Sequence, residues 1–210
     1  MHYAIEYHHD SSPYMAVGSR KRTSAGQLLR IIEGMALLRV GQHEWLLPAG
    51  SYFWLGAHTL AAFTPLANCR YDGVRCSLRM DQPAHVGWVR PSALLTALLN
   101  SLQQWQRPQT WQGAYGQRLH LIADELMQCA IAPQGDEALQ THWQAFVSGH
   151  TTAPPLGQPT LGPQWQLLQA VRQLKGGRKA SLVANESGYG DEAALGLACQ
   201  RWLGLALDEL

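Results

Sequence analysis

Aromatic and cationic residues in the first third of the chain have the chemistry of a small-molecule pocket. Aromatic rings supply flat apolar contact area, and a guanidinium recognises a carboxylate or phosphate. A pocket that combines them suits a small aromatic or anionic effector. The residues predicted to bind it are Arg30, Tyr52, Trp54 and His58, with Arg39, Trp45 and Phe53 nearby. Ordinary hydrophobic core is the alternative interpretation for the aromatic residues.

Two further groups precede the first clear strand. Residues 19–22 (SRKR) form the densest positive segment of the chain. They can hold an anionic effector or contact phosphates, but charges also stand on solvated strand edges, where they discourage pairing. We favour the strand edge. His8, His9 and Asp10 carry donor atoms that suit a metal ion, although we predict no metal site.

Enzymatic chemistry is not predicted. The chain contains no Gly-x-Ser-x-Gly turn, no His-Glu-x-x-His helix and no phosphate-binding loop. Its cysteines, Cys69, Cys76, Cys129 and Cys199, match no zinc spacing and are typical of reduced thiols. The first residues are unlike a secretion signal, and no apolar run reaches the roughly 18 residues of a membrane span. We expect a cytoplasmic protein without a cofactor or a membrane partner.

Residues 3–80 have the texture of short strands separated by turns. Apolar runs predict strands at 27–33, 35–40, 44–47, 51–55, 60–63 and 73–80. Turn residues recur about every eight positions, the spacing of an all-β sandwich or barrel. Alternation would send Tyr52 and Trp54 to one face of their strand and Phe53 to the other.

After Pro91 the pattern changes to helical spacing. Ser92 is predicted to cap a leucine-rich helix over 92–105. Further helices are predicted over 115–129, 137–147, 164–175, 180–187 and 191–203. Residues 148–163 contain four prolines and three glycines, and this composition predicts a linker.

These boundaries predict an α+β protein. The parts are an N-terminal β-barrel domain (1–85), a helical segment (86–147), the linker (148–163) and a small C-terminal helical domain (164–210). The leucine helix has a wide apolar face, of which one part must cover the barrel. The rest is expected to pair with a second copy in a symmetric homodimer, the commonest type of oligomer.

Residues 182–204 have the pattern of a helix-turn-helix. Ala184 is small where two helices would cross, and Gly188 stands where the turn needs a positive φ. Asp191 can cap the next helix. Leu195 and Cys199, four residues apart, keep an apolar stripe on one face.

This pattern resembles the second helix-turn-helix of the AraC family of bacterial transcription regulators. The positions that carry the resemblance include Val183, Ala184, Gly188, Tyr189, Asp191, Arg201 and Gly204. Residues 26–34, 40–41 and 46–50 resemble the cupin-like sensor barrel of the same family. Residues 87–91 and the leucine helix resemble the paired helices that often mediate dimerisation there.

The resemblance covers about half of the chain and implies an effector-sensing barrel joined to a DNA-binding domain. Metal-binding cupins have histidines ahead of the first barrel strand, where this chain has residues 20–24 (RKRTS). Only His58 stands in the region of the late metal-binding histidine. The resemblance therefore implies no metal.

The positions that read DNA depart from the family pattern. The recognition helices of DNA-binding proteins contact bases with side chains such as Arg, Asn, Gln, Ser and Thr. The outward positions here are Ala193, Ala194, Gly196, Leu197 and Ala198. The whole chain has a net charge of +1, and residues 166–210 carry five basic and five acidic side chains, which cancel. A first helix-turn-helix should lie between about 136 and 165, where the residues are too few.

Any DNA contact is therefore expected from Arg178, Lys179, Gln200 and Arg201. Contacts to phosphates position a protein on DNA but do not specify sequence. The sequence predicts an AraC-type transcription regulator that senses a small effector and binds DNA at most weakly. The alternative is an interaction protein that no longer binds DNA and modulates a related regulator as a heterodimer. A third interpretation is a barrel enzyme or carrier that has lost its metal.

Overall fold

Two antiparallel sheets form the β domain of the computed structural model, which describes residues 4–210. Residues 1–3 of the expected first domain lie outside that range. One sheet has the strand order β1-β8-β3-β6-β9-β10, and the other has the order β2-β7-β4-β5. The strands are β1 (Ile5–Ser12), β2 (Lys21–Arg22), β3 (Gly26–Glu33), β4 (Met35–Val40), β5 (His43–Pro48), β6 (Tyr52–Leu55), β7 (Leu60–Pro65), β8 (Cys69–Cys76), β9 (Gly87–Arg90) and β10 (Ala130–Ala132).

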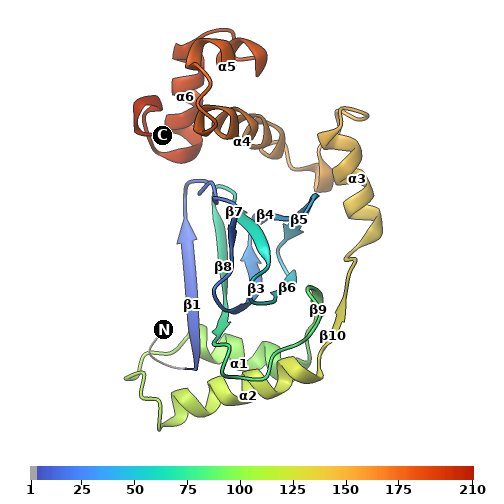
Figure 1. The fold of residues 1–210 in the computed structure, drawn as a ribbon, viewed down its shortest axis with the longest axis vertical. Helices are drawn as coiled ribbons and strands as arrows, with labels where there is room; N and C mark the ends of the chain where they lie inside the picture. The colour runs from blue at the N-terminus through green and yellow to red at the C-terminus, as the bar shows by residue number, and fades with distance from the viewer. Residues whose placement is uncertain (1–3) are drawn as a thin grey trace.

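The sheets face each other across an apolar interior. It is formed by Leu29, Ile31, Ala36, Leu38, Leu47, Phe53, Leu55, Ala61 and Cys69. Successive side chains of a strand point to opposite faces. The residues between these interior positions therefore lie on the outer faces of the two sheets. Both outer faces are covered by helices, so the barrel lies between two helical layers (Figure 1). The fold is therefore α+β, with a two-sheet β domain followed by helices, as predicted.

The strand predicted over 73–80 lies four residues earlier than expected. Strand β8 runs Cys69–Cys76 and pairs along its whole length with β1. It ends in a turn in which the Met80 N–H donates to the Ser77 carbonyl. The short strands β9 and β10, which pair with each other across the helices between them, were not predicted.

Helices α1 (Ala93–Gln103) and α2 (Ala114–Gln128) form a hairpin on the outer face of the larger sheet. The predicted cap is confirmed, since the Leu95 N–H donates to Ser92 Oγ at 2.9 Å. Leucines of α1 and α2 pack against Leu28, Trp54 and Val74 of the sheet. Leu94 and Leu121 remain 48% and 46% exposed. This pairing of helices lies at one end of the molecule, as Figure 1 shows.

Helix α3 (Glu137–Val147) covers the free edge of the smaller sheet at β5. The Gln140 side chain accepts from the Leu46 N–H at 3.2 Å and donates to the Leu46 carbonyl at 2.8 Å. The Trp143 indole and the Gln144 amide both donate to the Glu44 carbonyl. The unpaired backbone groups of an exposed edge strand can pair with other chains. Here side chains of α3 form hydrogen bonds with these backbone groups of β5.

The chain from 148 to 160 consists of turns and irregular backbone, with one short 3-10 helix at Pro155–Gly157. Helix α4 (Leu161–Lys175) begins three residues earlier than predicted, with Pro163 in its first turn. The first N–H groups of a helix have no partner within it, so a proline there costs no hydrogen bond.

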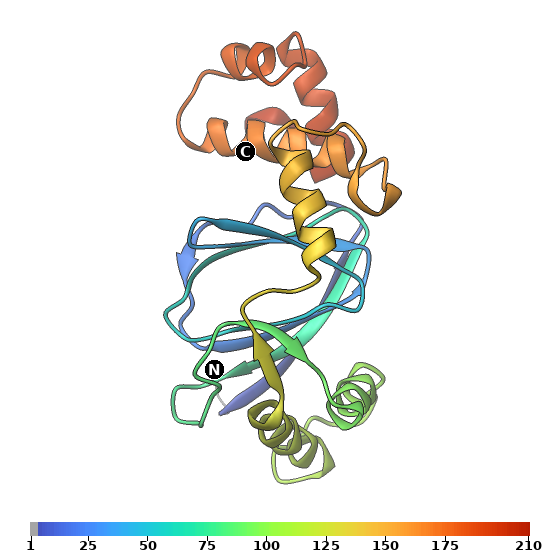
Figure 2. The same cartoon turned by 90° about the vertical axis from the view of Figure 1, so that its right-hand side faces the viewer.

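Helices α4, α5 (Ala180–Glu186) and α6 (Glu192–Leu203) form the C-terminal domain at the other end of the molecule (Figure 2). A short turn at Leu207–Glu209 follows. The domain shares one apolar core with Met35, Leu37 and Leu46 on the outer face of the smaller sheet. The N-terminal segment joins it, because the Met15 N–H donates to the Trp202 carbonyl at 2.7 Å. No helix within residues 4–210 is long and apolar enough to cross a membrane.

Substitution by alanine should change the stability in opposite directions at two glycines, Gly196 within α6 and Gly204 just after its last residue. Gly204 has φ +69°, and an added Cβ would lie 2.7 Å from the Tyr14 ring. Gly204→Ala should therefore destabilise the protein by about 1–2 kcal/mol. Gly196 has no heavy atom within 4 Å of an added Cβ, so Gly196→Ala should stabilise it by about 1 kcal/mol. Urea denaturation of the full chain measures both, and equal effects would contradict the geometry.

Candidate functional site

A pocket of about 440 Å³ opens into the barrel interior between the two sheets. One wall comes from β3 and β8, where Gln27, Tyr71 and Arg75 alternate inward. The other wall comes from β7 and from β2, which pairs with β7. Ligand pockets fall in the range of roughly 300–1,000 Å³, so this pocket can hold a small molecule.

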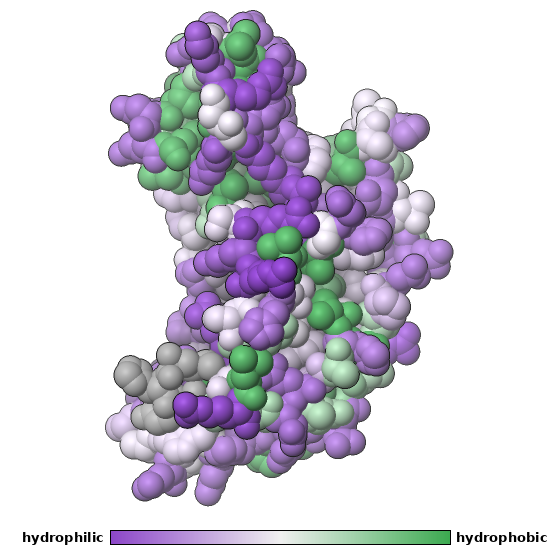
Figure 3. Space-filling model, in the orientation of Figure 1, coloured by the Kyte–Doolittle hydropathy of each residue, from purple (hydrophilic) through white to green (hydrophobic). Residues whose placement is uncertain are grey.

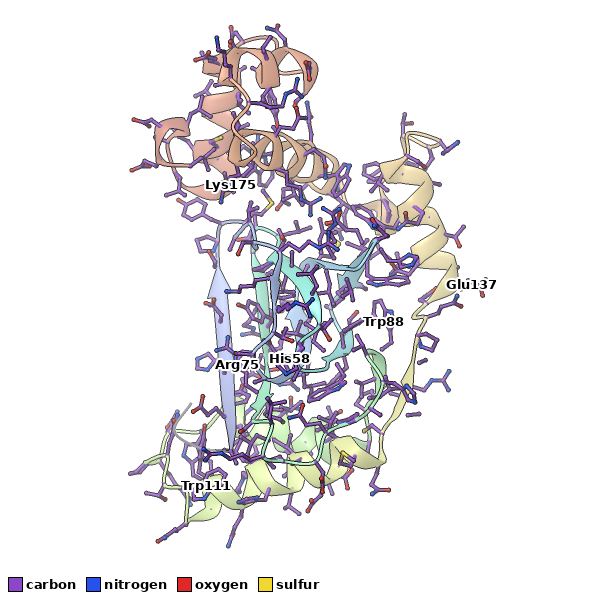
Figure 4. All side chains as sticks on the ribbon, viewed as in Figure 1. His58, Arg75, Trp88, Trp111, Glu137 and Lys175 are labelled. Carbon is purple, nitrogen blue, oxygen red and sulfur yellow. The ribbon has the colours of Figure 1, made fainter. Side chains whose placement is uncertain are left out.

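The rim of the pocket is cationic, whereas its base is apolar. Lys21, Arg22 and Arg75 are exposed at the rim. Leu55 and Ala61 are buried at the base, and Phe63 is half-buried. Figure 4 shows Arg75 among the strands of the barrel. This arrangement suits an amphipathic anion, with its charge at the rim and its apolar part inside.

His8 lies beside this pocket on the inward face of β1. The Gln27 side-chain amide, which lines the pocket, lies 3.2 Å from His8 Nε2. Within residues 4–210 the other ring nitrogen, Nδ1, is buried without a hydrogen-bond partner. Burial, with the charges of Arg75 and His9, lowers the pKa of His8 to about 4. His8 is therefore neutral at physiological pH.

Tyr71 contributes a second polar group to the same wall. Its hydroxyl donates to Asp10 Oδ2 at 3.3 Å, and its ring meets the Phe63 ring edge to face at 4.8 Å. Burial and the Asp10 carboxylate raise the pKa of Tyr71 to about 12, so the phenol stays protonated. The pocket thus contains convergent polar groups and is not purely apolar.

The four residues predicted to bind an effector do not converge on this pocket. Alternation along β6 is confirmed, because Phe53 faces the interior while Tyr52 and Trp54 face the helical hairpin. Trp54 is fully buried there and donates from Nε1 to the Pro83 carbonyl. His58 is exposed on a turn with φ +65°. The expectation that these residues line the barrel interior is corrected accordingly.

Arg30 is only 5% exposed and serves as a buried tie between sheet and hairpin. Its guanidinium donates to both Asp72 carboxylate oxygens, at 2.7 and 2.5 Å, and to Asn100 Oδ1 on α1 at 2.6 Å. The Tyr7 hydroxyl also donates to Asp72. Arg30 faces outward from β3, because its neighbours Leu29 and Ile31 point into the interior, so its guanidinium does not line the pocket.

The other charged groups are also placed by strand alternation. His8 and His9 point to opposite faces of β1 and so do not form one metal site. Among residues 4–210, no group of three or more His, Cys, Asp or Glu residues could hold a metal. Lys21 and Arg22 form the edge strand β2, as the favoured interpretation of residues 19–22 expected, and both also line the pocket.

The C-terminal segment has the geometry of a helix-turn-helix. Gly188 has φ +79°, and the Ala194 N–H donates to Asp191 Oδ1 at 2.8 Å. Ala184, Leu195 and Cys199 are fully buried between the helices. The predicted turn, cap and packing stripe are therefore confirmed.

The predicted DNA contacts, Arg178, Lys179, Gln200 and Arg201, are all exposed. Arg178 Nη2 donates to Glu186 Oε1 at 2.6 Å, which offsets part of its charge. The Arg201 guanidinium stacks on the Trp202 ring at 4.8 Å. On the outward face of α6, Leu197 is 68% exposed, and Leu182 on α5 is 51% exposed. Figure 3 shows apolar surface on this domain.

Sequence reasoning missed Gln27, Tyr71 and Arg75 as pocket residues. Gln27 and Arg75 are direct partners across β3 and β8. Neither strand alternates between polar and apolar residues, so the sequence carried no clear signal for their inward direction. The four-residue error in the position of β8 hid the inward direction of Tyr71.

Comparisons with known proteins give a likeness to solved structures. No known protein family and no curated protein matches the chain. ToxT of Vibrio cholerae aligns over 98% of this chain and 96% of its own, with 10% identity and a TM-score of 0.39. A ToxT structure bound to (E)-4-(8-methylnaphthalen-1-yl)but-3-enoic acid aligns over the same shares, with 10% identity and a TM-score of 0.34.

A cupin superfamily protein of Desulfitobacterium hafniense aligns with 35% of this chain and 67% of its own, with 14% identity and a TM-score of 0.32. At these scores and identities the likeness places the chain in no family and assigns it no function.

The low pKa of His8 predicts a loss of stability in acid. The unfolded chain takes up a proton at this residue below about pH 6.5, whereas the folded chain does so only near pH 4. The stability is therefore intact above pH 6.5 and is lost as the pH falls toward 4. In the native protein, protonation of His8 should lower the free energy of unfolding by about 2 kcal/mol between pH 7 and 5. The His8→Gln variant should lack this part of the decrease. Urea titrations test this against His85→Gln, an exposed histidine, and equal pH dependence in native and His8→Gln protein would contradict it.

Proposed function

We propose that the protein is an AraC-type transcription regulator whose β domain binds a small amphipathic anion. The observation that carries the proposal is the pocket with Lys21, Arg22 and Arg75 at its rim and apolar residues at its base. A guanidinium binds carboxylate and phosphate through paired hydrogen bonds. Gln27 and Tyr71 add polar groups on the wall of the pocket. We further propose that this site binds its ligand and does not transform it.

The helix-turn-helix supports at most weak contact with DNA. Its scaffold is intact, but its reading face is apolar, with Ala193 and Leu197 exposed. Direct readout of bases needs hydrogen-bonding side chains in the major groove. The remaining cations can contact phosphates, which gives binding that depends on salt and not on sequence.

A second candidate function is an interaction protein that modulates a related regulator. The exposure of Leu197 and Leu182 favours it, because large apolar side chains on an outward helix face suit a protein partner better than DNA. The hairpin offers a surface for such pairing as a homodimer or heterodimer. Leu94 and Leu121 are partly exposed there, and Ala97, Ser101 and Arg118 line a groove between α1 and α2.

The pocket should bind an aromatic carboxylate in preference to a neutral analogue. We expect 1-naphthoate to bind more tightly than 1-naphthalenemethanol, because only the carboxylate can pair with the cationic rim. Arg75→Gln and Arg22→Gln should each weaken naphthoate by about tenfold, as the loss of one charge-assisted contact implies. Isothermal titration measures this, with Arg79→Gln as the exposed control. Equal affinity for the acid and the alcohol would contradict the proposal that this pocket binds an anionic effector.

DNA binding should be detectable only at low salt. A mobility shift with DNA from the region upstream of the protein's own gene should weaken steeply as salt rises. Arg178→Ala with Lys179→Ala should reduce it further, whereas Arg79→Ala with Arg107→Ala should not. The absence of any shift at low salt would exclude direct DNA binding and favour the interaction protein.

A further inference from the structure

Four basic side chains converge where α4 meets the outer face of the smaller sheet. Arg20 and Arg39 come from the β domain, and Arg172 and Lys175 come from the last turn of α4. They line a hollow of about 380 Å³, whose remaining walls are Val17, Gly18, Ser19, Ala62 and Gly176. Figure 4 shows Lys175 on the side of the helical domain that faces the strands.

The charge in this hollow is poorly compensated. Arg172 donates from both terminal nitrogens to the Glu44 carboxylate. Arg20 donates to the neutral Gly41 carbonyl at 2.9 Å. Within residues 4–210, neither Arg20, Arg39 nor Lys175 forms an ion pair. Three positive charges are left, and the end of α4 offsets only about half a charge.

This hollow and the pocket in the barrel both border Gly18 and Ser19, but they lie on different sides of β7. Ala61 lines the interior pocket and its neighbour Ala62 lines the hollow, so the two lie on opposite faces of β7. Arg39 likewise faces away from the interior, because Leu38 and Ala36 of the same strand point into it. A ligand in one site therefore does not occupy the other.

We propose that the hollow binds a compact multivalent anion of the phosphate class, such as a diphosphate. Its uncompensated charge matches an anion of several negative charges, and the guanidinium groups of Arg20 and Arg39, which form no ion pair within residues 4–210, match the geometry of phosphate oxygens. Arg39 and Arg172 are half-buried in a concave site, which favours a small anion over the backbone of a DNA duplex. Because two cations come from each side, the anion binds α4 to the β domain.

Calorimetric titration with inorganic pyrophosphate tests the site, in phosphate-free buffer at constant ionic strength. We expect saturable binding that Arg39→Gln with Lys175→Gln weakens at least tenfold. Arg79→Gln with Arg107→Gln removes the same charge from two exposed arginines and should change the affinity less than twofold. Arg22→Gln, at the rim of the interior pocket, should also leave it unchanged. Adenosine diphosphate distinguishes the source: binding of both anions indicates a site open to nucleotides, and binding of pyrophosphate alone a site for the free anion.

Hydrogen exchange supplies a second readout. Pyrophosphate should slow amide exchange in the last turn of α4, since it links that turn to Arg20 and Arg39. No binding of pyrophosphate, or equal weakening by the two double variants, overturns the proposal. A third result also overturns the proposal: the protein binds a random-sequence DNA duplex but not pyrophosphate, and Arg39→Gln with Lys175→Gln abolishes the duplex binding. The four cations would then be contacts to a DNA backbone. The naphthoate experiment is independent of these outcomes, so either site can fail alone.

Discussion

The free edge of β5 is the constraint on which the arrangement of the molecule depends. The smaller sheet ends there, and its backbone groups need partners. Gln140 and Trp143 supply them by hydrogen bonding to Leu46 and Glu44. This contact fixes α3 against the barrel, and α3 leads the chain to the outer face of β4. Helix α4 then completes a core shared with Leu37 and Leu46, so the helix-turn-helix is packed on the barrel and not tethered by a free linker.

The smaller sheet consequently separates two cationic sites of different character. On its inner side the barrel pocket joins a basic rim to an apolar base, which suits an amphipathic ligand. On its outer side the hollow is bounded by Arg39 and Arg172 and suits a compact anion. Arg172 also pairs with Glu44, next to the edge that α3 covers. The outer site thus includes Arg172 and Lys175 of α4, from which α5 and α6 follow in the chain.

Sequence reasoning succeeded where the physics is local. The caps at Ser92 and Asp191 and the turn at Gly188 depend on a few neighbouring residues, and each was placed correctly. The expectation that Arg30 lines the barrel interior was wrong because it rested on residue type alone. Arg30 has the chemistry of an anion ligand, but Asp72 lies opposite it in the next strand and engages its guanidinium. Nothing in the order of the residues shows this pairing, since 42 positions separate the two.

The sequence by itself determined the α+β class, the positions of the helices and the apolar outward face of α6, because periodicity and local turn chemistry depend on short segments. It also determined that Tyr52 and Trp54 share a face. Only the tertiary structure decided which face that was, because alternation separates two sides without saying which one the helices cover. The tertiary structure alone also brought Gln27 to Arg75, and Arg39 to Lys175, since these contacts arise from strand register and helix docking between residues distant in the chain.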